Sequence, residues 1–160
     1  MAAFQGNNPE SVINFIRTNL PRHKQFALST VDGSGNPWTV CLNLSFDDEL
    51  NIIWKSRKDT EHSQHILLHP QVAVCVFSEE EGVGDFGFYA KALAHEVTDL
   101  VEIEKCIAIR YLQKGKPAPA MTDFLGDSPD RLYMACLTEA WVNDDSHVKT
   151  PVALPILQGR

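Results

Sequence analysis

The stretch "FALSTVDGSGNPWTVCLNLSF", residues 26–46, decides the fold of this chain. Its middle, DGSGN at residues 32–36, collects residue types that tolerate the backbone dihedrals of tight turns. After the turn, large apolar residues alternate with small or polar ones, as in a strand with one buried face: Trp38, Val40, Leu42, Leu44 and Phe46 against Thr39, Cys41, Asn43 and Ser45. The stretch therefore predicts two antiparallel strands joined by a tight turn.

Outward from this hairpin, the same patterns predict four more strands and three helices. The strands are expected at residues 49–56, 71–77, 86–97 and 131–143, with Gly87 as a candidate bulge. The helices are expected at residues 9–20, about 60–69 and 101–116. Turns rather than crossover helices join most strands, so we expect a mainly β fold with flanking helices, a small closed or split barrel. Side chains fill a barrel of this size, so a ligand would bind on its outer wall or at a subunit interface.

Composition limits the classes of function. The chain has 160 residues, 44% hydrophobic and 22% charged, the balance of one globular domain spanning residues 1–160. A formal net charge of −7 without a long run of Lys and Arg argues against a nucleic-acid partner. No segment approaches the roughly 18 apolar residues of a membrane span, and no targeting pattern is visible, so no membrane partner and a cytoplasmic location are expected. The cysteines Cys41, Cys75, Cys106 and Cys136 form no C-x-x-C pair and are expected as reduced, buried thiols.

The candidate site is "WKSRKDTEHSQHILLHP", residues 54–70, which allows three interpretations. On a helix, His62, His65 and His69 would share one face, the spacing of metal ligands. A row of imidazoles without a positioned glutamate is a weak zinc pattern, however, and we assign no metal ligand. The second interpretation is a solvated helix with no ligand.

The third interpretation is an anion site. Lys55, Ser56, Arg57 and Lys58 form a short basic cluster in an acidic chain, directly before a helix whose first turn carries His62 and Ser63. Unpaired N–H groups at a helix start, with hydroxyls and cations nearby, favour a bound phosphate ester.

A longer pattern contains this segment. The groups Ser29-Thr30-Val31-Asp32 and Asn36-Pro37 are followed in order by Ser56, Thr60, His62-Ser63, His69-Pro70 and Val72-Ala73-Val74. With this order and spacing, the chain resembles the FMN-binding split-barrel family related to pyridoxamine 5'-phosphate oxidase over about residues 12–97. The resemblance implies a six-stranded split β-barrel of FMN-binding type.

The resemblance also implies roles for individual residues. Ser56, Thr60, His62 and Ser63 would hold the FMN phosphate, with Lys55 and Arg57 adding positive potential. The flavin ring would lie along Thr39, Val40 and Cys41 and near Ile53 and Trp54. Members of the family are homodimers with the flavin between subunits, so Trp38 or Trp141 of one chain could line the partner's site.

The expected function is that of an FMN-dependent oxidoreductase acting on an unidentified small molecule, without an assigned catalytic residue. Pyridoxamine 5'-phosphate oxidase activity itself is not expected, because the C-terminal R-x-H of that enzyme is missing from residues 131–149. The alternatives are a non-catalytic flavin, deazaflavin or haem binder, such as a sensor or stress protein, and a metal-binding protein using the histidine row. Fold alone does not choose among them.

Overall fold

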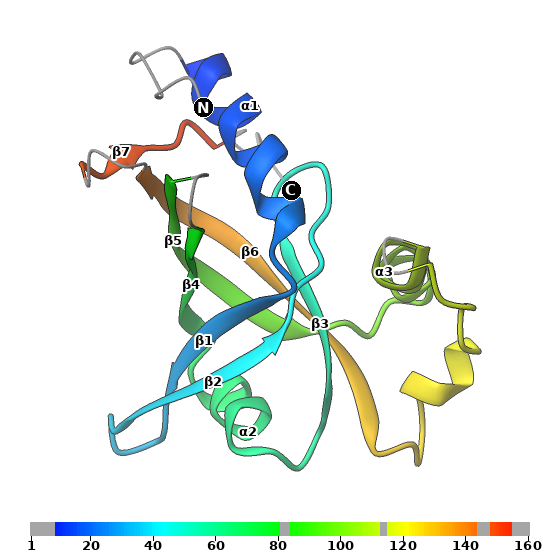
Figure 1. Cartoon of the computed structure of the whole chain (residues 1–160). Helices are drawn as coiled ribbons and strands as arrows, with labels where there is room; N and C mark the ends of the chain where they lie inside the picture. Colours follow the sequence, from blue (N-terminus) through cyan, green and yellow to red (C-terminus); the bar gives the residue numbers. More distant parts are fainter. Residues whose placement is uncertain (1–8, 81–83, 113–114, 144–147, 155–160) are drawn as a thin grey trace.

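The computed structural model describes residues 9–80, 84–112, 115–143 and 148–154, and within them the chain folds around one antiparallel sheet (Figure 1). The strands are β1 (Gln25–Val31), β2 (Pro37–Asn43), β3 (Ile52–Arg57), β4 (Gln71–Glu80), β5 (Gly84–Glu96), β6 (Asp130–Asn143) and β7 (Thr150–Pro151). The helices are α1 (Pro9–Asn19), α2 (Glu61–Leu68) and α3 (Leu100–Leu112), with 3₁₀ turns η1 (Leu20–Arg22) and η2 (Met121–Phe124). The prediction of a mainly β fold with flanking helices is confirmed.

The order of strands explains why the barrel is split. The strands run β2-β1-β4-β5-β6-β3, so β2 and β3 are the two ends of the sheet. Curvature brings these ends together only in part, through a bridge between Phe46 and Ile52 and a 2.8 Å bond from the Ile53 N–H to the Ser45 carbonyl. Six strands were predicted, and the structure adds the two-residue β7, which pairs with β6. The split therefore lies between β2 and β3, beside the candidate site.

Two apolar clusters lie on opposite sides of β3, because successive side chains of a strand point to opposite faces. Inside the barrel, Trp54 stacks on Tyr133 at 5.6 Å between ring centroids and meets the edge of Phe26. On the outer face, Ile53 packs in a second cluster with Ile103 of α3. The barrel interior is thus filled by side chains, as predicted, which leaves the outer wall and the split for a ligand.

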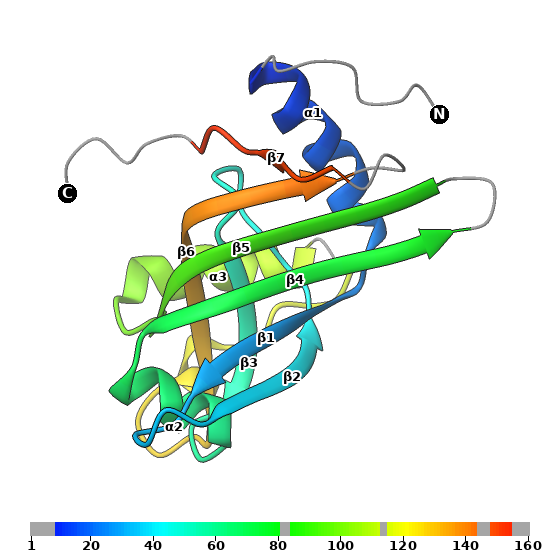
Figure 2. The same cartoon turned by 90° about the vertical axis from the view of Figure 1, so that its left-hand side faces the viewer.

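The helices cover only part of the barrel. α1 and α2 lie at its two opposite ends, and α3 lies beyond β3 (Figure 1). Figure 2 looks onto β1, β2, β4 and β5, and no described helix lies across them on this side. None of the described helices is both long and apolar enough to cross a membrane.

The predicted bulge at Gly87 is wrong. The register between β5 and β6 shifts between Lys91 and Ala92 instead. Gly87 is paired with Phe77 on one side and with Asn143 on the other. A Cβ at this position would collide with the Asn143 side chain and lie 2.8 Å from the ring of Tyr89, so close packing explains the glycine.

The prediction of buried thiols holds for one cysteine of four. All four cysteines are thiols outside any disulfide, but only Cys106 is buried, and burial raises the pKa of its thiol to about 12. Cys75 and Cys136 are half-buried and Cys41 is exposed. The difference arises because Cys41 and Cys75 lie on the outward face of the sheet. The alternation of residue types along a strand did not by itself show which face would point outward.

Candidate functional site

The candidate site is built where β3 ends and α2 begins. β3 ends at Arg57, and the Lys58 N–H bonds to the Pro129 carbonyl at 2.9 Å, which fixes the turn against the start of β6. Thr60 occupies the position before α2 with extended dihedrals (φ −80°, ψ 155°), and its side chain makes no capping hydrogen bond. The first N–H groups of α2 therefore lack a side-chain cap, which leaves them for an anion or water.

The predicted phosphate-binding side chains form a network among themselves. The Ser56 hydroxyl lies 2.6 Å from His62 Nε2, and the Ser63 hydroxyl donates to the Arg57 carbonyl at 2.8 Å. The Thr60 hydroxyl lies 2.9 Å from Ser63 Oγ and 3.2 Å from His62 Nε2. We call Ser56, Thr60, His62 and Ser63 the α2 network.

Burial changes the role that these residues can have. Ser56, His62 and Ser63 are buried, and only Thr60 is partly exposed. Three of the four residues expected to hold a phosphate are thus buried, and their polar groups are bonded within the α2 network and to the backbone. Their role in this structure is to fasten α2 to β3, and direct contact with an anion is left to Thr60 and the backbone of the turn.

His62 carries no permanent charge in this environment. Burial lowers the pKa of the imidazole below its usual 6.5, and the nearby Glu61 carboxylate opposes this only in part. The hydroxyl of Tyr133 belongs to the same region, since burial raises its pKa while a hydrogen bond with Ser63 opposes the rise. The α2 network is therefore a neutral hydrogen-bonded layer at neutral pH.

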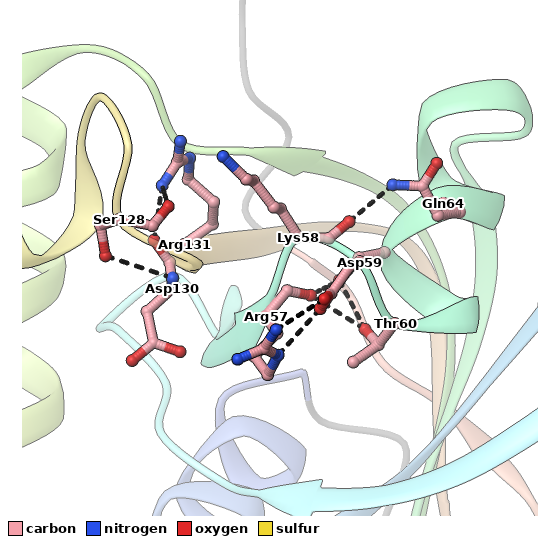
Figure 3. Close-up of polar contacts among 9 residues, drawn as sticks. Arg57, Lys58, Asp59, Thr60, Gln64, Ser128, Asp130 and Arg131 are labelled. Atoms are coloured by element: carbon pink, nitrogen blue, oxygen red, sulfur yellow. Dashed lines mark hydrogen bonds and ion pairs between the residues drawn. The ribbon is translucent and has the colours of Figure 1, made fainter.

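Two cations of the segment are paired with carboxylates, and Figure 3 shows one of these pairs, Arg57 with Asp59. The Lys55 ammonium lies 2.8 Å from Asp130, and the exposed Arg57 guanidinium holds Asp59 with two bonds of 2.9 and 2.6 Å. The Lys58 ammonium has no such partner among the described residues. An anion arriving here would meet Lys58 directly and would compete with Asp59 for Arg57.

The residues expected along the flavin ring fall into two groups. Thr39 and Cys41 are exposed on the outer face of β2 and Val40 is half-buried, so this strand is accessible to a ligand. Ile53 and Trp54 have no exposed surface. Their side chains are therefore covered, so β3 could contribute only backbone groups to a ring on the outer wall, and the placement of the ring near these two residues stays a prediction.

The histidine row does not assemble into a metal centre. His65 is half-buried, with Nδ1 3.0 Å from the Thr30 hydroxyl, while His62 bonds to Ser56 on another side of the helix start. α2 ends at Leu68, so His69 follows the helix in extended conformation. In the part of the chain that the structure describes, no three His, Cys, Asp or Glu side chains gather as metal ligands.

A second polar site was missed by sequence reasoning. A pocket of about 720 Å³ adjoins β3 and α3, and its polar lining comes from four separate segments: Lys24, Asn43, Lys55, Arg110, Tyr111 and Lys116. We call it the Arg110 pocket. These residues are spread over more than ninety positions of sequence, so no local motif joins them. The only available signal was that Arg110 interrupts an otherwise apolar helix end.

The strand order and the partial closure between β2 and β3 define the class of protein by its fold: a split β-barrel. A model of the pyridoxamine 5'-phosphate oxidase family matches residues 14–136. The chain therefore belongs to this family. No curated protein sequence matches it.

Solved structures with the same fold have very different sequences. A conserved hypothetical protein from Mycobacterium tuberculosis has a TM-score of 0.68 and 11% identity, with 91% of this chain and 89% of that chain covered. A haem-binding protein from Mycobacterium smegmatis has a TM-score of 0.67 and 12% identity, with 88% and 57% covered. An FAD-binding protein from Mesorhizobium loti has a TM-score of 0.60 and 14% identity, with 82% and 93% covered. Identities this low establish the likeness in fold alone.

Proposed function

We propose that this protein binds FMN and is an oxidoreductase that acts on a small molecule. The observation that carries the proposal is the exposed cationic turn between β3 and α2, in a chain of the pyridoxamine 5'-phosphate oxidase family. A phosphate monoester is a small dianion, which suits uncapped N–H groups with one free and one exchangeable cation. Likeness to an FAD-binding protein supports a flavin.

The roles of the residues follow from their exposure. Thr60, Arg57 and Lys58 would contact the phosphate, while Ser56, His62 and Ser63 hold the turn in place. Lys55 adds positive potential beside them. The ring would lie on Thr39, Val40 and Cys41 at the split. Bound flavin would supply the hydride chemistry, and the chain would supply binding, orientation and electrostatics.

We further propose that the protein is a homodimer formed through the face seen in Figure 2. The register places Cys41, Ala27, Cys75, Tyr89 and Trp141 in one row across five strands, and Phe77 on this face is 56% exposed. An uncovered apolar sheet face favours association with a second copy. Phe88 does not belong to this face, because it is fully buried. Light scattering should give twice the chain mass of 17.9 kDa.

Four cysteines outside any disulfide favour a reducing compartment, so the cytoplasm is the proposed location. In an oxidising compartment, the cysteines that are exposed or half-buried on strands would be prone to form intermolecular disulfides. The proposal concerns the cellular compartment only and is tested by the redox state of Cys41 in protein taken directly from cells.

The test compares ligands that differ by one group. FMN, riboflavin and FAD are titrated into the cofactor-free protein, and the change in flavin fluorescence is measured. Binding of FMN but much weaker binding of riboflavin is expected, because riboflavin lacks the phosphate. Thr60→Ala should weaken FMN binding by about 1–3 kcal/mol, the usual loss for a hydrogen bond to a charged group. The control His69→Ala should leave the affinity unchanged, and equal binding of FMN and riboflavin would contradict the phosphate placement.

A haem or deazaflavin ligand, bound without turnover, is the second candidate. It is favoured by the likeness in fold to a haem-binding protein. Absorption spectra of the freshly purified protein decide between the two, since a Soret band identifies haem and a flavin band identifies FMN. A bound flavin that no common hydride donor reduces would favour a non-catalytic binder.

A further inference from the structure

The Arg110 pocket concentrates positive charge in an acidic protein. It has a volume of about 720 Å³, within the usual range for small-molecule sites. Four cations line it, Lys24, Lys55, Arg110 and Lys116, out of 14 in the whole chain, and no described lining residue is acidic. This gathering of four cations contrasts with the formal net charge of −7 of the whole chain.

Arg110 is the central observation. The Arg110 residue is only 7% exposed; its guanidinium donates from Nη1 to the Asn43 carbonyl at 3.3 Å and has a side-chain hydrogen bond with Tyr111. Burial lowers the pKa of this guanidinium, and the charge and hydrogen bond of Tyr111 oppose the shift, whereas no carboxylate contributes to it. Among the described residues it forms no ion pair. An arginine stays charged even when buried, so a guanidinium without a counter-ion is costly and favours the binding of an anion.

The three lysines contribute differently. Lys24 and Lys116 are exposed at the rim, from the start of β1 and the end of α3. Lys55 reaches the pocket from β3, but its ion pair with Asp130 offsets part of its charge. The pocket therefore combines one buried, planar donor with exposed cations, the arrangement that suits a bound oxyanion group.

We propose that the Arg110 pocket binds the oxyanion group, phosphate or carboxylate, of a small organic substrate. This inference rests on the proposed function, because Lys55 joins the pocket to the segment that would hold the flavin. It specifies that function by assigning the substrate class: an anionic molecule oriented by Arg110 with its remainder directed toward the split between β2 and β3. Arg110 is a binding residue in this proposal and exchanges no proton.

The experiment measures anion binding and flavin binding separately. Inorganic phosphate and acetate are titrated by calorimetry at constant ionic strength into the protein as purified, with and without added FMN. Arg110→Gln should lower the affinity for the bound anion at least tenfold, and Lys24→Gln and Lys116→Gln should each lower it severalfold. The matched control is Arg17→Gln, which removes an exposed positive charge outside the pocket lining and should change nothing.

Each outcome decides the question. Binding of either anion that depends on Arg110 supports the proposal, and the preferred anion identifies the substrate group. If the wild type binds neither anion, or if Arg17→Gln loses as much affinity as the pocket variants, the proposal is overturned. It is also overturned if Lys24→Gln and Lys116→Gln weaken FMN as strongly as phosphate, since the pocket would then belong to the cofactor. If Arg110→Gln does not fold, the anion affinities of Lys24→Gln and Lys116→Gln decide whether the proposal holds. Failure of flavin binding with intact anion binding would refute the proposed function alone.

Discussion

The α2 network and the Arg110 pocket lie along the same strand, β3, and differ in how their polar groups are satisfied. In the α2 network, Ser56, His62 and Ser63 are buried and bonded to one another and to the backbone. In the Arg110 pocket, a buried guanidinium has a long bond to the Asn43 carbonyl and a hydrogen bond with Tyr111, but no described carboxylate partner. The first arrangement stabilises the fold, whereas the second stores a free-energy cost that an anion would offset.

The most conspicuous motif of the sequence does not present the side chains that are most available for binding a ligand. The hydroxyls and histidine of residues 56–63 attract attention because they adjoin in sequence. The fold uses most of them internally and exposes only the turn around them. The stability of the fold and the affinity for a ligand must therefore be measured separately in each variant.

The largest expected effect is the loss of His62. His62→Ala removes a buried ring and leaves the Ser56 hydroxyl without its 2.6 Å partner. The cavity and the unsatisfied hydroxyl together should lower the free energy of unfolding by about 3 kcal/mol. Urea denaturation of the cofactor-free protein measures this change. His69→Ala, beyond the end of α2, should cost less than about 0.5 kcal/mol. A small loss in His62→Ala would show that the α2 network is not a structural element.

A change of opposite sign is expected at the Arg110 pocket. Arg110→Met removes a buried charge and keeps an unbranched apolar stem, so stability in anion-free buffer should rise by about 1 kcal/mol. Added phosphate should raise the melting temperature of the wild type more than that of the variant, in which only the turn between β3 and α2 can still bind it. A variant less stable than the wild type in anion-free buffer would mean that Arg110 is already satisfied.

A smaller effect should appear as a dependence on pH. Because burial holds the folded-state pKa of His62 below 6.5, the unfolded chain binds more protons as the pH falls through this value. The contribution of His62 to stability is therefore fully present above about pH 6.5 and decreases below it. The difference in unfolding free energy between the wild type and His62→Gln should shrink from about pH 7.5 to about pH 5. A difference that grows on acidification would indicate a charged His62.

The smallest effect on stability is expected at the exposed pair of Arg57 and Asp59. Both side chains are more than half exposed, and such pairs often contribute nothing measurable. Arg57→Gln should therefore leave the urea midpoint unchanged while it weakens FMN binding. Asp59→Asn releases the guanidinium and should strengthen FMN binding under the same conditions. If both variants leave FMN affinity unaltered, the phosphate does not bind at this turn.

Much of the fold could be predicted from local patterns. The DGSGN turn forms as expected, because the Asp32 carboxylate accepts bonds from the N–H groups of Ser34 and Asn36 and fixes the hairpin. All six predicted strands and all three helices are present, with shifts of a few residues at their ends. The candidate site was found only as a segment. Which of its side chains point outward depends on their position against β6 and Tyr133, which are distant in sequence.

The sequence by itself determined the hairpin, the helix starts and the pairing of strands by turns, because these depend on interactions between residues a few positions apart. The tertiary structure alone decided that Ser63 and His62 are buried and that Cys41 is exposed. It also decided that Arg110 lines one pocket with Lys24, Lys55 and Lys116. Side-chain burial and electrostatic environment depend on which elements pack together across the split. Closure of the sheet between β2 and β3 fixes that packing, and it is a property of the whole chain.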